Sequence, residues 1–369
     1  MEHISELRSS LNVHFRWNKA RMTCFVQMLL ALFTVRTVNL NKLACVISGG
    51  AAEQSSRYRR IQRFFSGFKI DFDMVAGFIF RLFFVSGGKW CLTMDRTNWK
   101  WGQSNINILT LGIAYKGTAI PIYWELLDKR GNSDTPERIA LIERYIKSFG
   151  KDSIVELLCD RELIGEEWFR WLSLNNISFC IRIRNNTVTT NARGEKAWMD
   201  TLFYGLKPGE QRVLDGKRQV TGCFVYLSGL RLHDGDMLIV ATDKAPEKAI
   251  DRYAIRWEIE TLFGCLKGRG FHIEDTHITN LERIKKLFVL LAIAFAWAHK
   301  TGEWKNEARP IKIKKHGRRA ISLFRVGLDY ISAAVVNVFT QPDLLKKCLG
   351  QISGTEKINV LGIHSQMCG

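Results

Sequence analysis

Cysteine pairs, prolines and long hydrophobic runs are the features that this chain has least of. Only six of its 369 residues are proline, so we expect no long proline-rich linker. The nine cysteines are scattered singly, without a C-x-x-C pair. This spacing argues against a disulfide framework or a zinc site and is typical of reduced thiols in a cytosolic protein. The most apolar run, Leu287 to Ala298, is too short to span a bilayer and predicts a buried helix.

Acidic residues are scarce relative to basic ones. The chain has 54 Lys and Arg against 36 Asp and Glu, a formal net charge of +18 and a pI near 9.6. Such an excess favours a polyanionic partner, most simply nucleic acid, although it does not distinguish an enzyme from a binding protein. Met1 to Asn18 is charged and polar, so no signal peptide is expected. We therefore expect a cytoplasmic protein without a membrane partner.

The stretch from Tyr253 to Lys267 is the most informative in the chain. Read as one helix, it places four polar or charged residues on one exposed face: Tyr253, Arg256, Glu260 and Lys267. A carboxylate can bind a metal ion, cations can hold phosphates, and an aromatic ring can pack against a sugar or base. This mixture suits chemistry on a nucleic-acid strand, although the solvated face of an amphipathic helix would look the same. The opposite face is apolar and predicts packing against a core, through Ile255, Ile259, Leu262, Phe263 and Leu266.

Two aspartates follow apolar runs that have the composition of strands. Asp95 follows residues 90–94, and Asp160 follows residues 154–159. An Asp at the end of an apolar strand costs desolvation free energy unless a cation or hydrogen-bond donors compensate. A turn or a helix cap explains a lone Asp of this kind. Two such strands together with Glu260 indicate converging carboxylates, which chemistry with two metal ions requires.

The predicted elements follow one another in the manner of a mixed sheet. After the strand that carries Asp95, strands are expected at 106–115 and 118–124, with a turn at 116–117. A helix that begins at 133–137 and runs to about residue 149 comes next. The strand at 154–159, a helix near 165–175 and a strand at 177–183 complete the order. It predicts an α/β, ribonuclease-H-like mixed sheet with helices on both faces, in which the strands of Asp95 and Asp160 are neighbours.

Together these residues resemble a known family. The spacing Tyr-x2-Arg-x3-Glu-x6-Lys is met from Tyr253 to Lys267, after Asp95-x-Thr97 and Asp160-Arg161-Glu162 in that order. The chain thus resembles the DDE transposases of bacterial insertion sequences, and more narrowly insertion-sequence family four. The resemblance spans roughly residues 20–330.

The resemblance implies a DNA transposase that binds the terminal repeats of an insertion sequence and catalyses metal-dependent cut-and-paste excision and strand transfer into target DNA. The catalytic residues, which bind two Mg²⁺ or Mn²⁺ ions, would be Asp95, Asp160 and Glu260. One ion would activate water or a DNA 3′-hydroxyl, and the other would stabilise the leaving oxygen. Phosphates near the transposon end would be held by Tyr253, Arg256 and Lys267. Excision through a hairpin takes a base out of the stack, and we expect a homodimer on double-stranded DNA.

The family also has a β-rich insertion between the second Asp and the Glu, expected here at about 188–245 with strands at 219–227 and 236–241. Family members often brace the flipped base with a tryptophan of this insertion. The only tryptophan between 185 and 250 is Trp198, for which we expect ordinary helix packing and assign no such role. The expected domains are a helical DNA-binding region at 1–88, the catalytic domain at 89–300 and a basic C-terminal region at 301–369.

Two basic segments lie outside the signature. Residues 55–65 combine an apolar face with four arginines, Arg57, Arg59, Arg60 and Arg63. Our hypothesis is that this segment grips the terminal repeat, with Gly49-Gly50 as the turn of a helix-turn-helix-like unit; a solvated basic face is the alternative. Residues 305–319 hold seven cations and one acid, a pattern typical of solvated tails that would also suit non-specific phosphate contacts.

Two alternatives to a transposase remain open. One is an endonuclease on the same fold that cuts without strand transfer, and the other is a catalytically silent or repurposed DNA-binding protein. The Tyr-Arg-Glu-Lys pattern favours the transposase, and the presence of all three carboxylates argues against the silent protein. A metal requirement would separate both enzymes from the binding protein. In any of these roles the protein would act in the bacterial cytoplasm, associated with the nucleoid.

Overall fold

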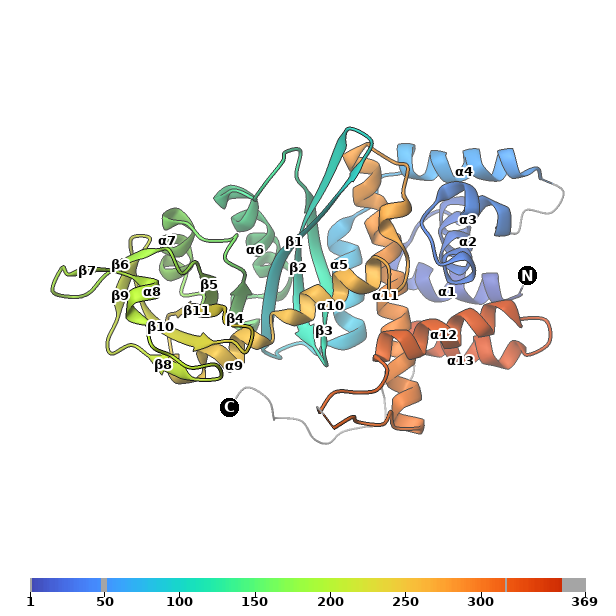
Figure 1. Cartoon of the computed structure of the whole chain (residues 1–369). Helices are drawn as coiled ribbons and strands as arrows, with labels where there is room; N and C mark the ends of the chain where they lie inside the picture. Colours follow the sequence, from blue (N-terminus) through green and yellow to red (C-terminus); the bar gives the residue numbers. More distant parts are fainter. Residues whose placement is uncertain (1, 48–51, 316, 354–369) are drawn as a thin grey trace. The chain divides into compact units, whose positions relative to one another are not determined.

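A computed structural model describes residues 2–47, 52–315 and 317–353, and the chain forms two compact units (Figure 1). The helical unit comprises residues 1–84, 265–277 and 286–369, and the sheet unit comprises residues 85–264 and 278–285. This division differs from the expected domain boundaries, because two segments that follow the sheet belong with the N-terminal helices. The functions expected of the three domains stay predictions.

The helical unit has five described helices within residues 1–88, where the sequence predicts a helical region. Its helices are α1 (Glu2–Phe15), α2 (Lys19–Val35), α3 (Leu40–Val46), α4 (Gln54–Gly67), α5 (Phe72–Phe83), the short 3-10 turn η3 (Ile273–Asp275), α11 (Leu281–Ala308, whose first residues belong to the sheet unit), α12 (Leu323–Val336) and α13 (Pro342–Ser353). The expected turn at Gly49-Gly50 lies outside the described residues.

The core of the helical unit forms around α11. Every residue from Leu287 to Ala298 is fully buried, which confirms the buried helix predicted there. The indole of Trp297 donates a hydrogen bond of 2.7 Å to the backbone carbonyl of Cys348, and its ring packs edge-on against Phe33. In the described chain no single helix has the length and apolarity to cross a membrane; only α2 and α3 taken together, bent by 99°, meet that test.

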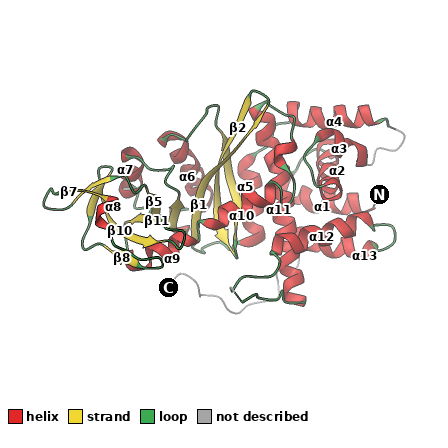
Figure 2. Cartoon of the chain, viewed as in Figure 1, coloured by secondary structure: helices red, strands yellow, loops and turns green. Residues whose placement is uncertain are grey.

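The sheet unit contains the predicted strands and helices in the predicted order (Figure 2). Its strands are β1 (Trp90–Trp101), β2 (Ser104–Tyr115), β3 (Thr118–Leu126), β4 (Ile154–Cys159), β5 (Phe179–Ile183), β6 (Val188–Thr190), β7 (Lys196–Trp198), β8 (Gln211–Val213), β9 (Arg218–Val220), β10 (Cys223–Arg231) and β11 (Met237–Thr242). Its helices are α6 (Thr135–Phe149), η1 (Lys151–Ser153), α7 (Glu166–Leu174), α8 (Met199–Leu202), η2 (Pro246–Lys248), α9 (Ala249–Ala254) and α10 (Trp257–Leu266).

The strands form one mixed sheet in the order β3-β2-β1-β4-β5-β11-β10-β9-β6-β7, with β8 paired to β10. Strand β4 runs parallel to both β1 and β5, and the other pairs are antiparallel. The expected mixed α/β sheet is thus confirmed. Helix α6 between β3 and β4 begins with the capping box of Asp134 and Glu137, which satisfies two of the free N–H groups at its start.

Three strands differ from the expectation. β1 does not end at Asp95 but continues to Trp101, because β2 pairs with it along its whole outer half. The strand expected at 219–227 is divided into β9 and β10 at Thr221-Gly222, where both residues have positive φ. The strand expected at 236–241 in the insertion is β11, which pairs with β5 as well as β10 and so extends the central sheet.

A carboxylate at the start of α10 fixes this helix to the sheet. Glu258 accepts hydrogen bonds from the backbone N–H groups of Tyr115 and Gly117, at 2.5 and 2.8 Å. These residues form the end of the tight β2–β3 turn, in which Lys116 and Gly117 have the positive φ angles that such turns require. The turn predicted at 116–117 is confirmed, and it serves as the anchor of α10.

We expect Glu258→Ala to lower the free energy of unfolding by about 1–3 kcal/mol, because it removes a charged acceptor from two backbone donors. The measurement is urea unfolding at about pH 8.5, where Glu258 is ionised, since burial raises its pKa to about 7. Glu247→Ala, an equivalent change at an exposed position of η2, is the matched control and should cost less than about 0.5 kcal/mol. Equal effects of the two substitutions would show that Glu258 is not an anchor.

Candidate active site

The two predicted aspartates are brought together by the register of parallel strands. Met94 on β1 pairs with Cys159, the last residue of β4. Asp95 and Asp160 are the residues that follow this pair on the two segments. The register therefore sets them beside each other where β4 ends and β1 continues. Cys159 is fully buried below them. The positions of both carboxylates therefore follow from the strand pairing and not from a flexible loop.

The signature segment is not one continuous helix, contrary to the expectation. α9 ends at Ala254 and α10 begins at Trp257, with the backbone N–H of Arg256 bonded to the carbonyl of Tyr253 in a tighter turn between them. Tyr253 and Arg256 are 1% and 3% exposed, so the predicted exposed polar stripe is wrong for these two residues. They are buried because each has a carboxylate partner for its polar end.

Arg256 and Tyr253 bind all three predicted catalytic carboxylates. The Arg256 guanidinium forms a 3.0 Å ion pair with Asp95 and a second ion pair with Glu260, one turn further along α10. The Tyr253 hydroxyl donates a 3.0 Å hydrogen bond to Asp160. The Tyr253 ring belongs to a buried cluster with Leu158 and other residues of the sheet and α9. The site thus joins β1, the end of β4 and both helices of the signature segment.

The carboxylates share one electrostatic environment. Burial, with smaller contributions from the charges of Asp160 and Glu260, raises the pKa of Asp95 to about 6 against the opposing charge of Arg256. Burial also raises the pKa of Tyr253, so its hydroxyl keeps the proton that it donates to Asp160. The pKa of Arg256 lies above its ordinary value although burial lowers it, because Tyr253, Asp95 and Asp160 raise it more. Arg256 is therefore a permanent cation among these acids.

Another ion pair, which was not predicted from the sequence, links residues that follow the two aspartates. Arg96, directly after Asp95, pairs with Glu162 at 2.9 Å and also donates to the side-chain carbonyl of Asn107 at 3.3 Å. This pair joins β1 to the loop after β4, which carries Asp160. Its signal was present in the sequence as one charged residue close behind each aspartate.

A further missed pair lies within the sheet. Glu156 on β4 is 1% exposed and forms a 3.0 Å ion pair with Arg252 of α9. The pair lacks the geometry of a hydrogen bond, since this Glu156 oxygen has no hydrogen-bond partner. Burial raises the pKa of Glu156 to about 7, against the charges of Arg252 and Lys244. A lone acid within the apolar run 154–159 was the sequence signal for a paired, buried charge.

The other predicted residues lie in the helical unit or at the far end of the sheet. Lys267 follows the end of α10 and pairs with Glu274 at 2.8 Å. The four predicted arginines of the DNA-binding segment all lie on α4. Trp198 does not pack in a helix as expected: it ends strand β7 and is 54% exposed. No bracing role follows for it from these facts.

The three carboxylates suit a hard divalent cation in donor type, because each supplies only oxygen. Arg256 occupies the place of a counter-charge between Asp95 and Glu260. In this arrangement no group of three His, Cys, Asp or Glu side chains in the described residues is close enough to hold an ion. The donor set thus fits a divalent metal ion in the chemical type of its ligands.

Comparison with known proteins identifies the family. Residues 86–297 match the family model of the transposase DDE domain. The match covers more than half of the chain, which therefore belongs to the DDE transposase family, as the resemblance implied. Transposases act on DNA, which accords with the net charge of +18.

No curated protein matches the chain. Among solved structures it is similar to a piggyBac transposase in the cryo-EM structure of its synaptic complex with hairpin DNA. The two chains are 12% identical with a TM-score of 0.46, over 95% of this chain and 83% of that chain.

We expect Glu156 to impose a pH dependence on stability. Its pKa is about 7 in the folded chain and near 4.5 when unfolded, so between these values the folded state binds more protons. The free energy of unfolding should therefore fall as pH rises from about 4.5 to 7, by at most about 1.4 kcal/mol per pH unit from this group. Glu156→Gln should remove this contribution and make the slope shallower, while the contribution of Asp95, whose pKa is about 6, remains. Urea unfolding from pH 4.5 to 8 checks it, and an unchanged slope in the variant would contradict the assignment.

Proposed function

We propose that the protein is a transposase of insertion-sequence family four, which binds the terminal repeats of its insertion sequence and catalyses cut-and-paste excision and strand transfer. The proposal includes a ribonuclease-H-like catalytic sheet, a homodimer on double-stranded DNA and action in the bacterial cytoplasm. The observation that carries it is the convergence of Asp95, Asp160 and Glu260 around Arg256. The match to the DDE transposase family supports the same chemistry.

The proposed metal ligands are the carboxylates of Asp95, Asp160 and Glu260, with Mg²⁺ or Mn²⁺ as the ions. Two bound ions supply an activated attacking oxygen and a stabilised leaving oxygen in phosphoryl transfer. Glu260 is suited to admit an ion from solvent, because its side chain is 41% exposed while that of Asp95 is 15% exposed. The buried sheet holds the two aspartates in place while Glu260 adapts.

Arg256 and Tyr253 have a proposed second role in holding DNA phosphates. If metal ions were held by Asp95 and Glu260, the Arg256 guanidinium would offer donors in a fixed fork that matches phosphate geometry. Tyr253 keeps its proton and can donate to a phosphate oxygen as it does to Asp160. Lys267 completes the signature as a proposed phosphate ligand. In this proposal the three residues bind internal carboxylates in the free protein and would bind phosphates of the substrate.

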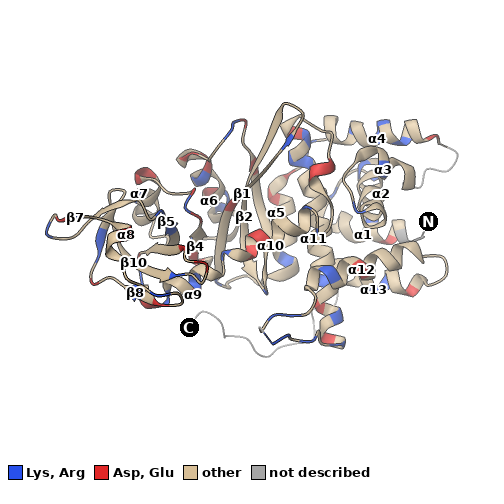
Figure 3. Cartoon of the chain, in the orientation of Figure 1, with Lys and Arg blue, Asp and Glu red and all other residues tan. Residues whose placement is uncertain are grey.

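The helical unit has the proposed role of binding the terminal repeat through α4. Its four arginines are Arg57, Arg59, Arg60 and Arg63, and the apolar side of the helix is buried through Ile61, Phe64 and Phe65. This amphipathic arrangement fixes α4 in the unit and leaves its basic side available. In Figure 3 the blue colour of basic residues, which in α4 are all arginines, recurs along this helix.

Cleavage of a labelled DNA that carries the insertion sequence's own end tests the proposed function. The wild type with Mg²⁺ or Mn²⁺ should produce nicks or hairpins at that end and join the end to target DNA. Glu260→Ala should reduce cleavage at least about a hundredfold, because a lost metal ligand removes several kcal/mol of charge stabilisation. Glu247→Ala, at an exposed site of η2, is the control. Cutting without joining would indicate an endonuclease, and binding without cutting would indicate a silent DNA-binding protein.

Removal of Arg256 should destabilise the metal-free protein. Arg256→Ala leaves Asp95 without its cation, and loss of one partner of a buried pair costs about 3 kcal/mol. Unfolding in the presence of a chelator measures this loss, with Arg256→Lys as the variant that keeps the charge. Mn²⁺ should then restore more stability to Arg256→Ala than it adds to the wild type, because the ion replaces the missing charge. If the variant is as stable as the wild type in chelator, Arg256 is not the counter-charge of this site.

A further inference from the structure

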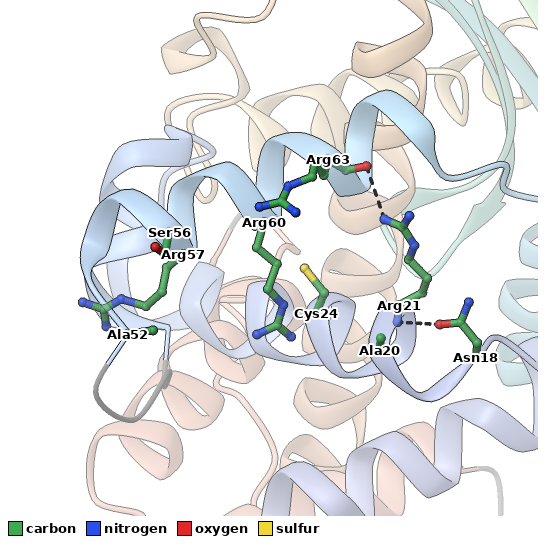
Figure 4. Close-up of a pocket in the computed structure, with 9 residues that line it drawn as sticks. All are labelled: Asn18, Ala20, Arg21, Cys24, Ala52, Ser56, Arg57, Arg60 and Arg63. Atoms are coloured by element: carbon green, nitrogen blue, oxygen red, sulfur yellow. Dashed lines mark hydrogen bonds between the residues drawn. The ribbon is translucent and has the colours of Figure 1, made fainter.

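A pocket of about 500 Å³ lies between α2 and α4 of the helical unit (Figure 4). Four arginines contribute to its lining, one from α2 and three from α4: Arg21, Arg57, Arg60 and Arg63. The other described lining residues are neutral: Asn18, Ala20, Cys24, Ala52 and Ser56. A concave surface with four guanidinium groups and no carboxylate has the charge of an anion-binding site.

Helical spacing explains which arginines of α4 reach the pocket. Arg57, Arg60 and Arg63 recur at intervals of three residues and so lie on one side of the helix. Arg59 lies about 100° around the helix from Arg60, is exposed and does not line the pocket. The sequence alone groups Arg59 with the other three arginines of α4. It does not indicate Arg21, which is far from them in the chain.

Neutral groups hold the guanidinium groups in place. Arg21 donates to the backbone carbonyl of Arg63 at 3.3 Å and lies 5.6 Å from the ring centre of Phe68. Arg57 donates to the carbonyl of Ile47 at 2.8 Å. Such contacts reduce the conformational entropy lost on binding, because the side chains are already ordered. They do not neutralise the positive charge.

Two of these charges come close to one buried atom. Burial raises the pKa of the Cys24 thiol, while Arg60 and Arg21 oppose this rise through their charges, and Arg60 also through a hydrogen bond to the thiol. Cys24 is 3% exposed and lies among the pocket residues. Arg21 of α2 and Arg60 of α4 thus place positive charge near the same buried thiol.

Arginines elsewhere in the helical unit are treated differently. Arg36 and Arg325 both pair with Asp329, at 2.7 and 2.8 Å. Within the described parts of the chain, none of the four pocket arginines has an ion pair with a carboxylate at 4.0 Å or less. Their mutual repulsion is relieved when a polyanion supplies the missing negative charge.

We propose that the pocket between α2 and α4 binds a phosphodiester group of the DNA backbone through Arg21, Arg57, Arg60 and Arg63, independently of base sequence. This proposal deepens the proposed DNA binding of α4 and rests on it. A backbone phosphate fits because guanidinium groups bind its oxygens in pairs. A phosphate contact fixes the position of the protein on the duplex without reading bases.

The test measures binding of the full chain to two duplexes of equal length and unrelated sequence, over a range of salt concentrations and without divalent metal. Arg60→Ala and Arg21→Ala should each weaken binding about tenfold, equally for both duplexes. Each should also lower the slope of log affinity against log salt by about one. Arg325→Ala, which removes an arginine already paired with Asp329, is the matched control and should leave both quantities unchanged.

A double substitution tests whether the arginines share one phosphate. Arg21→Ala with Arg60→Ala should weaken binding by less than the product of the two single effects, because the first change already loosens the shared phosphate. Arg59→Ala with Arg60→Ala should give the full product, because Arg59 lies outside the pocket. A full product for Arg21 with Arg60, no effect of either single change, or a loss confined to one duplex would overturn the proposal.

Folding is checked by thermal unfolding of each variant, because Arg21 also contacts α4. Arg21→Lys and Arg60→Lys keep the charge and lose the forked donors; they should retain the salt slope and bind more weakly than the wild type. Wild-type protein that fails to bind either duplex would also overturn the proposal. Failure of the proposed transposase function would give a different result: DNA would still bind to the pocket, but DNA ends would remain uncut with Mg²⁺ or Mn²⁺.

Discussion

Three carboxylates lie close together in a partly buried site, and the surrounding residues of the sheet unit have to stabilise them. Like charges repel, and burial of each acid costs solvation free energy. Arg256 offsets both costs for Asp95 and Glu260, while Tyr253 supplies a hydrogen bond to Asp160. Both side chains lie at or next to the break between α9 and α10. Without a metal ion, the stability of this arrangement therefore depends on Tyr253 and Arg256, two residues of the same short segment.

Other acids around the site are also stabilised by a cation or by hydrogen-bond donors. Arg96 pairs with Glu162 beside the aspartates, Arg252 pairs with Glu156 within the sheet, and backbone N–H groups satisfy Glu258. Each of these three acids has its own partner on a different segment of the chain. These pairs tie β1, β4, α9 and α10 to one another, so the geometry of the site is held by the frame around it. The proposed metal ions would enter a site whose walls are already fixed.

The helical unit handles charge in another way. Its apolar core, with α11 at the centre, needs no polar frame, and its pocket arginines are ordered by carbonyl groups and an aromatic ring instead of by acids. Positive charge is therefore kept available for an external anion. In the sheet unit the charges around the site are paired with one another, whereas the pocket arginines of the helical unit have no acidic partner among the described residues. Both features agree with a protein of the DDE transposase family, whose proposed tasks are metal chemistry and DNA binding.

The sequence by itself determined the elements of the sheet unit, their order and the family, because apolar runs, turn residues and residue spacing are local properties of the chain. The strands at 106–115 and 154–159 and the buried helix at 287–298 were predictable for that reason. The register that sets Asp95 beside Asp160, the break after Ala254, and the burial of Tyr253 and Arg256 were decided only by tertiary structure. The same holds for Arg21, which joins the α4 arginines across some forty residues of chain. Charge pairs between distant segments have no local pattern, so only folding reveals which cation meets which acid.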